Sequence, residues 1–119
     1  MKRLLVVLSS VAILAFTGCK KEAGIGVIGI TVVTEDGVPI QNCQVSLTVP
    51  VENAVQFYGR TDENGFIEFR YGLHVYYDVW VGKGLWEGCD FVEIKPGETR
   101  YKNIIIYPPN TSFNGCIWS

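Results

Sequence analysis

Four cysteines are the residues of this chain with the most chemistry open to them. They are Cys19, Cys43, Cys89 and Cys116, in a chain of 119 residues. An even number of thiols suggests two disulfides, but a thiol can also carry a lipid chain. The fate of Cys19 decides how much of the chain has to fold and where the protein works.

The segment before Cys19 has the pattern of a secretory signal. Lys2 and Arg3 precede an apolar run over residues 4–16 that is interrupted only by two serines. A charged start followed by a short apolar run is typical of a signal peptide, whereas a membrane-spanning helix needs about 20 apolar residues. We therefore predict export rather than a spanning helix.

The tetrapeptide at residues 16–19, FTGC, resembles the lipobox of bacterial lipoproteins, in which the cysteine is the invariant element. The resemblance implies that residues 1–18 are removed, that the Cys19 thiol carries a diacylglycerol, and that residues 19–25 form a short tether. Two or more acyl chains hold a protein stably on a bilayer. Phe16 stands where leucine is usual, so a plain secretory signal or an uncleaved anchor stays open as an alternative.

The charge of the chain argues against a nucleic-acid partner. The net charge is −2, and without Lys2 and Arg3 eight basic residues remain against twelve acidic ones, a net charge of −4. Domains that bind nucleic acids have a basic face instead. The length that remains after residue 18 is enough for one domain.

Alternation of apolar and polar residues predicts strands throughout the mature chain. In residues 43–49, for example, Val45 and Leu47 alternate with polar residues. Comparable runs occupy residues 27–33, 66–71, 75–81, 90–94 and 102–106, with a weaker one at 54–60. Turn signals between the runs include Asp36-Gly37, Asn64-Gly65 and Pro96-Gly97. Short strands at roughly ten-residue spacing predict an all-β fold, a seven-stranded antiparallel β-sandwich.

If Cys19 carries lipid, three thiols remain in a compartment that permits disulfides. In seven strands that alternate in direction, Cys43, Cys89 and Cys116 all come to one end of the fold. We expect a Cys89–Cys116 disulfide, because it would pin the C-terminal tail beside its neighbour strand, and a buried free thiol at Cys43. Strand direction alone does not decide which two of the three cysteines form a disulfide, and a Cys43–Cys116 pair stays the alternative.

No group of residues has the spacing of a catalytic or metal site. His74 is the only histidine, and no recognisable nucleophile motif lies near it. Asp62, Glu63 and Asn64 are explained by a hairpin turn, since Ca²⁺ needs six to eight oxygen ligands. A Cys-x-x-Cys or paired-histidine zinc motif is missing from the sequence. We expect no enzyme activity, no metal and no cofactor.

Aromatic residues are the candidates for binding. Tyr76 and Trp80 fall opposite the apolar face of their predicted strand, and Trp86 lies in the glycine-rich loop that follows. Exposed aromatics stack on sugar rings or form the centre of protein interfaces. The alternative is structural, with the tail or the edge of the second sheet covering them.

The order of these features resembles the carboxypeptidase-regulatory-like domains, whose fold is a transthyretin-like (prealbumin-like) sandwich. The resemblance rests on the Asp-Gly-x-Pro-Ile turn at residues 36–40 and the Thr-Asp-x-x-Gly-Phe run at residues 61–66. It implies an Ig-like/prealbumin-like sandwich over residues 26–107, with residues 108–119 as a tail packed on it. Motifs of this kind are structural and say little about function.

Related collagen-adhesin B-type domains contain a Lys-to-Asn isopeptide bond that needs a lysine in the first strand. Residues 25–34 contain no lysine, so we expect no such bond. Taken together, the features predict a lipid-anchored, non-catalytic module of the bacterial cell envelope with a structural or protein-interaction role. The alternative is a glycan- or peptide-binding accessory lipoprotein that uses the exposed aromatics. The expected partners are the membrane, through the lipid anchor, and an envelope protein or glycan.

Overall fold

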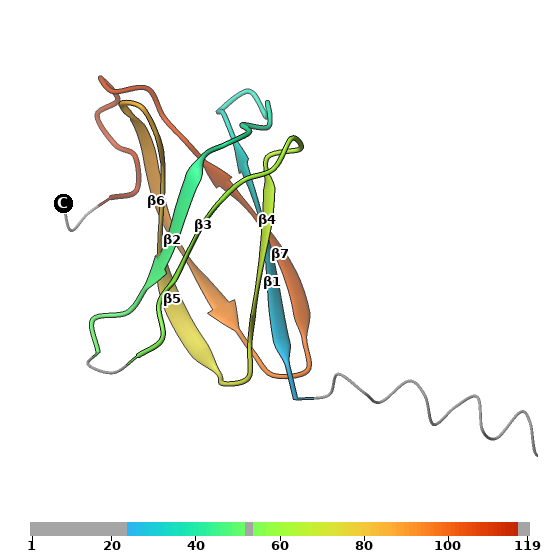
Figure 1. Cartoon of the computed structure of the whole chain (residues 1–119). Helices are drawn as coiled ribbons and strands as arrows, with labels where there is room; N and C mark the ends of the chain where they lie inside the picture. Colours follow the sequence, from blue (N-terminus) through green and yellow to red (C-terminus); the bar gives the residue numbers. More distant parts are fainter. Residues whose placement is uncertain (1–23, 52–53, 117–119) are drawn as a thin grey trace, which may run out of the picture.

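The computed structural model describes residues 24–51 and 54–116, and this part of the chain forms seven strands. The strands are β1 (Gly26–Val33), β2 (Gln44–Thr48), β3 (Phe57–Arg60), β4 (Phe66–Tyr71), β5 (Val75–Lys83), β6 (Trp86–Ile94) and β7 (Thr99–Ile105). They form two sheets, ordered β4-β1-β7 and β3-β2-β5-β6, that pack against each other (Figure 1). The predicted all-β, seven-stranded sandwich is confirmed. The predicted signal peptide and Cys19 lie outside the described residues.

One strand pair differs from the predicted antiparallel arrangement. β1 and β7 are neighbours in parallel, with Val27 opposite Thr99 and Val33 opposite Ile105. The reason is strand parity. When seven strands alternate in direction, all odd-numbered strands run the same way, so two odd-numbered neighbours have to be parallel. The other pairs within the two sheets are antiparallel.

The core lies between the two sheets and follows the alternation seen in the sequence. Its fully buried side chains are Ile30, Val32, Cys43, Val45, Leu47, Tyr77, Val79, Val81, Ile94, Ile104 and Ile106. Each buried apolar side chain of this size contributes about 1.5–3 kcal/mol relative to an exposed one. Within the described residues, no helix is long and apolar enough to span a membrane.

The middle strand of the three-stranded sheet, β1, is covered on both faces. Gly29 lies on its outer face, where a Cβ atom would come within 2.7 Å of the Tyr101 ring and 2.8 Å of the Phe66 ring. The two rings therefore lie directly over the β1 backbone. This packing holds Tyr101 in place at the edge of the candidate site described below.

The connection between β3 and β4 was expected to be a hairpin turn, and it is a turn of a different kind. Asp62 Oδ1 accepts hydrogen bonds from the N–H groups of Asn64 (2.8 Å) and Phe66 (3.0 Å). Gly65 follows with a φ of 73°, which glycine adopts without strain. Because β3 and β4 belong to different sheets, this turn carries the chain across the sandwich instead of closing a hairpin.

Candidate functional site at the open side of the sandwich

At one side of the sandwich, the edge strand β6 of one sheet lies near the edge strand β7 of the other. We call this the open side. A turn over residues 95–98 joins the two strands at one end. Neither strand has a further sheet neighbour here, so part of each backbone edge is free to meet another molecule.

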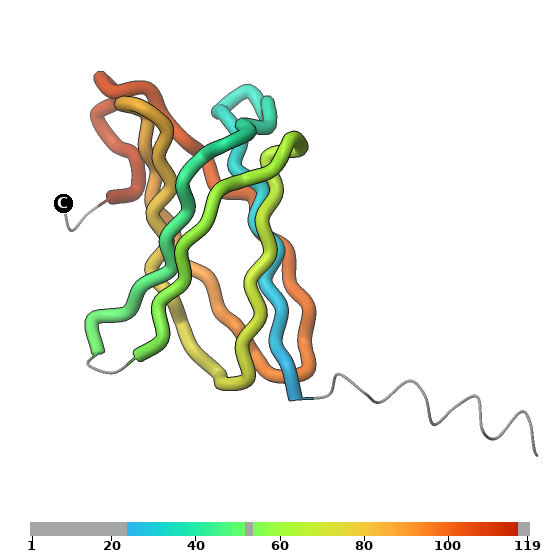
Figure 2. The backbone as a smooth tube through the Cα atoms, viewed as in Figure 1, coloured from blue at the N-terminus to red at the C-terminus, as the bar shows by residue number. Residues whose placement is uncertain are grey.

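The C-terminal tail covers the first part of the β6 edge. Glu87 and Tyr107 exchange two backbone hydrogen bonds, of 3.1 and 2.9 Å, and the Cys89 N–H donates to the Asn114 carbonyl at 3.1 Å. A Cβ atom at Gly115 would come within 2.3 Å of the Cys89 carbonyl oxygen, so the tail lies directly against the strand. Figure 2 shows the tail running back beside β6.

The Cys89–Cys116 disulfide holds this tail in place, as predicted from the sequence. Cys43 is a free thiol with no exposed surface. Burial raises the pKa of the Cys43 thiol. Its Sγ atom lies 3.4 Å from the Gly82 carbonyl oxygen. The alternative Cys43–Cys116 pair is wrong, because Cys43 points into the core while the tail lies outside the sheet.

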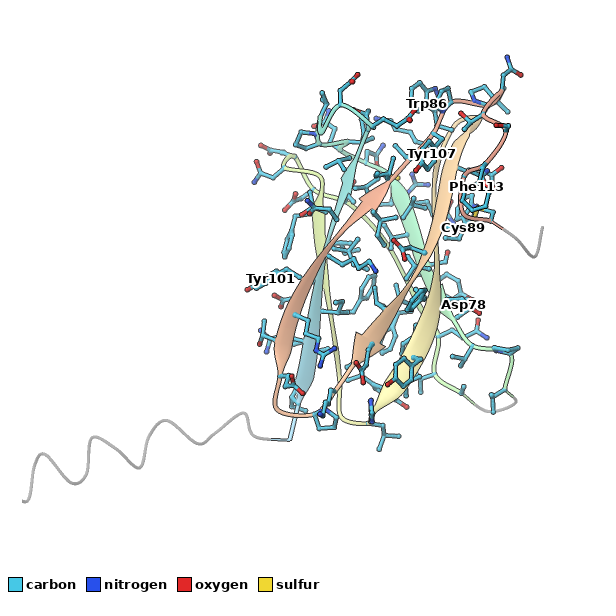
Figure 3. All side chains as sticks on the ribbon, turned by 180° about the vertical axis from the view of Figure 1, so that it is seen from behind. Asp78, Trp86, Cys89, Tyr101, Tyr107 and Phe113 are labelled. Atoms are coloured by element: carbon cyan, nitrogen blue, oxygen red, sulfur yellow. A yellow bond between two sulfur atoms is a disulfide. The ribbon has the colours of Figure 1, made fainter. Side chains whose placement is uncertain are left out.

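The rest of the β6 edge borders a groove of about 270 Å³ at the open side. Three of the residues that line it have exposed aromatic side chains: Tyr76 and Phe91 to 62% and Tyr101 to 74%. The groove is also lined by Ile28, Val92, Glu93, Arg100 and Lys102. Figure 3 shows the Tyr101 side chain projecting from β7 away from β6, and its ring lies over Gly29 on the outer face of the three-stranded sheet. Exposed rings around a partly apolar groove are a common composition for a binding surface.

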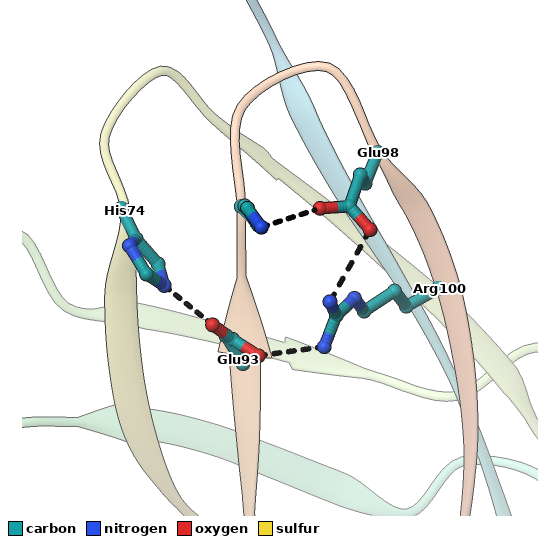
Figure 4. A network of polar contacts seen from close by, with 5 residues as sticks. His74, Glu93, Glu98 and Arg100 are labelled. Carbon is teal, nitrogen blue, oxygen red and sulfur yellow. Dashed lines mark hydrogen bonds and ion pairs between the residues drawn. The ribbon is translucent and has the colours of Figure 1, made fainter.

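A chain of ion pairs forms one end of the groove (Figure 4). The Glu93 carboxylate contacts His74 Nε2 with one oxygen and the Arg100 guanidinium, at 2.6 Å, with the other. Arg100 also contacts Glu98 at 3.2 Å, and Glu98 contacts Lys95 at 3.4 Å. The network links three segments: the start of β5, the end of β6 and the start of β7.

These contacts keep the two carboxylates ionised. The hydrogen bond from His74, with further contributions from Tyr76 and the charge of Arg100, lowers the pKa of Glu93. Hydrogen bonds from Arg100 and Lys95 lower the pKa of Glu98. The same Glu93 carboxylate raises the pKa of the Tyr76 phenol, through a hydrogen bond and through its charge. At neutral pH the groove therefore presents paired charges and the neutral phenol of Tyr76.

Lys102 connects the two strands further along the groove. Its Nζ atom lies 3.2 Å from Asp90 Oδ1 and 5.0 Å from the centre of the Phe91 ring. Asp90 Oδ1 also accepts a hydrogen bond from the Phe91 N–H at 2.8 Å. A lysine over an aromatic face contributes a cation–π attraction as well as the ion pair. Lys102 and Asp90 together keep Phe91 turned outward at the groove.

The three aromatics selected from the sequence do not form one surface. Tyr76 lines the groove, but Trp80 is half-buried and lies flat over Gly82, where a Cβ atom would come within 2.2 Å of its ring. The Trp80 indole N–H also donates to Glu87 Oε1 at 3.2 Å. Trp80 therefore has a structural role, in which it packs on its own sheet, whereas the alternative from the sequence had the tail or the edge of the second sheet covering it.

Trp86 lies elsewhere because the expected glycine-rich loop is a tight turn, with Gly84 and Leu85 between the two strands. Trp86 is the first residue of β6 and pairs with Lys83, which places it on the opposite face of the sheet from Trp80. It lines a separate hollow with Ile40 and Ile106 at the other end of the molecule.

Two groove residues, Phe91 and Tyr101, were missed in the sequence. Both alternate with core residues: Phe91 precedes the buried Val92, and Tyr101 has the phase opposite to the buried Ile104. That alternation places each ring on an outer face, but it does not show that the two edges lie near each other.

Among the described residues, no cluster of three His, Cys, Asp or Glu side chains is placed to hold a metal ion.

Comparisons with known proteins extend to the fold alone. No protein-family model matches this chain, and no curated protein does. One similar solved structure is the Bacillus anthracis TIE protein, with 18% identity and a TM-score of 0.54 over 69% of this chain and 16% of that chain. Another is BcpA, the major pilin subunit of Bacillus cereus, with 17% identity and a TM-score of 0.51 over 70% of this chain and 30% of that chain. This chain therefore spans less than a third of either protein.

Proposed function

We propose that this protein is a lipid-anchored, non-catalytic β-sandwich of the bacterial cell envelope, and that its open side binds a partner protein. The observation that carries the binding role is the groove itself. Tyr76 and Phe91 line it from the outer face of β5 and β6, Tyr101 lines it from β7, and its charged residues are paired. Exposed aromatic and arginine side chains are the residues that contribute most to the centres of protein interfaces.

The chemistry of the groove supports binding rather than catalysis. A general acid or base works best with a pKa near the operating pH. The pKa of Glu93 is lowered instead, because the carboxylate accepts hydrogen bonds from His74 and Tyr76 and faces Arg100. In this proposal, the Glu93 carboxylate holds His74 and Arg100 in fixed positions at the end of the groove.

The lipid anchor is supported by the tetrapeptide at residues 16–19 and the apolar run before it. The turn motifs at residues 36–40 and 61–66 support a relationship to the carboxypeptidase-regulatory-like sandwiches. A pilin subunit is among the similar folds, which agrees with a structural or interaction role. The proposed location is the periplasmic or outer face of a bacterial membrane.

The anchor is tested by growing a bacterial host that expresses the full chain with an alkyne-tagged fatty acid. The protein should become labelled and should fractionate with membranes. Cys19→Ala should lose both properties. Labelling that persists in Cys19→Ala, or a wild-type protein without label, would contradict the anchor.

The binding role is tested with a photo-crosslinking amino acid in place of Phe91. A protein captured there is identified, purified and measured for binding to the wild-type domain. Replacing Tyr76, Phe91 and Tyr101 together by Ala should weaken its binding by about 30-fold or more, since interface aromatics typically contribute about 2 kcal/mol or more. Tyr58→Ala is the matched control, because Tyr58 is also 62% exposed but lies on β3. Equal losses in both variants would refute the assignment of the groove.

A glycan ligand is the second candidate, and the exposed rings of Tyr76 and Phe91 favour it because aromatic faces stack on sugars. It predicts binding on a glycan array that is lost in the triple variant and retained in Tyr58→Ala. Saturable binding to a purified protein without any array signal would favour the protein partner instead.

A further inference from the structure

Three segments meet at the end of the sandwich where the described chain begins. They are residues 24–25, residues 72–74 between β4 and β5, and the turn at residues 95–98, and we call them the tether end (Figure 1). The Gly97 N–H donates to the Ile25 carbonyl at 3.0 Å, and the Val27 N–H donates to the Glu98 carbonyl at 2.9 Å. The Ile25 side chain lies beside Gly72, 4.0 Å from where a Cβ would be. Residues 24–25 are therefore held against the domain by a backbone hydrogen bond and a side-chain contact of Ile25.

The tether end carries apolar side chains that the domain does not cover. Leu73 is 61% exposed and Ile25 is 42% exposed. Lys95 and His74 stand beside them, with 51% and 47% of their side chains exposed. Apolar side chains flanked by a lysine are the composition of a surface that lies in the interface of a bilayer.

The charges of the two ends of the molecule differ. At the tether end, the carboxylates of Glu93 and Glu98 are matched by Arg100 and Lys95. At the far end, the turns between β1 and β2 and between β3 and β4 carry four exposed acidic side chains, Glu35, Asp36, Asp62 and Glu63, against two exposed basic ones nearby, Arg60 and Lys83. Anionic headgroups repel an acidic surface within about a Debye length, so they disfavour the far end and accept the tether end.

Chain length adds an independent restriction. Ile25 lies only six positions after Cys19, so the span between them has six residue steps. Fully extended, they reach about 20 Å at most. A lipid on Cys19 therefore keeps the tether end next to the bilayer surface, whereas the far end is about 30 Å further away, the length of a nine-residue strand.

We propose that the tether end rests on the lipid bilayer, with Ile25 and Leu73 inserted among the headgroups and Lys95 near the lipid phosphates. This inference rests on the lipid anchor proposed above. It fixes the orientation of the domain: the strands stand away from the membrane, and the open side faces sideways, accessible to a partner in the envelope. The contact adds no catalysis and needs no ligand other than anionic phospholipid.

The experiment uses the full lipidated chain in vesicles of phosphatidylglycerol and phosphatidylethanolamine. An environment-sensitive fluorophore is attached to Leu73→Cys or, as the control, to Leu85→Cys, which is 78% exposed at the far end. Labelling is selective because Cys43 is fully buried and Cys89 and Cys116 are bonded to each other. Nitroxide-labelled lipids should quench the probe at position 73 several-fold more strongly than the probe at position 85.

A second variant tests whether the contact depends on the apolar side chains. Ile25→Ser should reduce the quenching at position 73, whereas Val38→Ser, an equally small change at a 54% exposed far-end residue, should leave it unchanged. Folding of each variant is checked by its unfolding transition.

The outcomes separate the two proposals. If the protein floats with the vesicles but both probes are equally weakly quenched, the domain swings freely and this inference is wrong, while the anchor stands. If the protein does not float with the vesicles, the anchor itself is wrong. If the probe at position 73 is shielded before vesicles are added, the tether end contacts another copy of the chain, and the inference is again wrong.

Discussion

The two sides of the sandwich are closed in different ways. Opposite the open side, the edge strands β3 and β4 are joined by a cluster of four aromatic rings. Phe57 packs against Phe69, Tyr71 and Tyr77 with ring centres 5.5 to 5.8 Å apart. We call this the closed side. The open side between β6 and β7 has ion pairs and a disulfide-bonded tail in the corresponding place.

The difference shows how a small domain divides stability from recognition. Buried rings exclude water and stabilise the fold through their apolar area, which leaves nothing for a partner to bind. Exposed ion pairs contribute little to stability, but they hold side chains in a defined arrangement at the surface. We therefore expect substitutions at the closed side to unfold the protein and those at the groove to leave it folded.

The largest expected effect is at the closed side. Phe69 is 7% exposed, and Phe69→Ala should lower the free energy of unfolding by about 3–5 kcal/mol, because it leaves a cavity among the rings. Phe91→Ala at the groove is the matched control and should cost about 0.5 kcal/mol or less. Urea unfolding of both variants measures the difference. Similar losses would remove the distinction between the two sides.

The next effect concerns the tail at the open side. Cys116→Ser opens a crosslink between residues 27 positions apart, and chain entropy predicts a loss of about 3.5 kcal/mol. The loss should appear in urea unfolding under non-reducing conditions, and wild-type protein with a reducing agent should match it. Cys89→Ser should give the same value as Cys116→Ser. An unchanged midpoint would show that the tail is held by its backbone contacts alone.

Trp80 gives an intermediate effect and sharpens the comparison within one strand. Trp80→Ala uncovers Gly82 and removes the hydrogen bond to Glu87, so it should cost about 2 kcal/mol. Tyr76→Ala, four residues earlier on β5, should change stability by about 0.5 kcal/mol or less. If the two variants are equally stable, Trp80 is not the structural cover described above.

The smallest expected effect is the pH dependence of the ion pairs. The folded pKa of Glu93 lies below its ordinary value of 4.5, so its contribution to stability is present above that value and is lost as the pH falls through the folded pKa. The difference in unfolding free energy between wild type and Glu93→Gln should therefore be larger at pH 7 than at pH 3. Glu63→Gln, in the turn at the far end, is the control. A difference that does not vary with pH would exclude an electrostatic role for Glu93.

Period-two alternation was enough to predict the strands and the sandwich, because inner positions such as Val45, Leu47 and Val79 are buried by one rule along every strand. Strand parity brought Cys89 and Cys116 to one end. It also implied the parallel β1–β7 pair, which was not recognised because strand order across a sheet does not appear in local patterns. The groove depends on the two sheet edges lying near each other, and no local pattern encodes that distance. Trp80 was ambiguous for a different reason: period two places it on the same face as Gly82, but it does not show whether the ring folds over the glycine or projects toward a partner.

The parallel pairing of β1 with β7 has a consequence for the order in which the molecule is built. The first strand cannot gain its second neighbour until the last strand has been synthesised, and contacts between such distant segments form slowly because a long loop must close first. The three-stranded sheet, the aligned β6–β7 edges and the Cys89–Cys116 bond all wait for residues near the C-terminus. A nascent chain of this design therefore cannot complete its fold until nearly all of its residues have been synthesised.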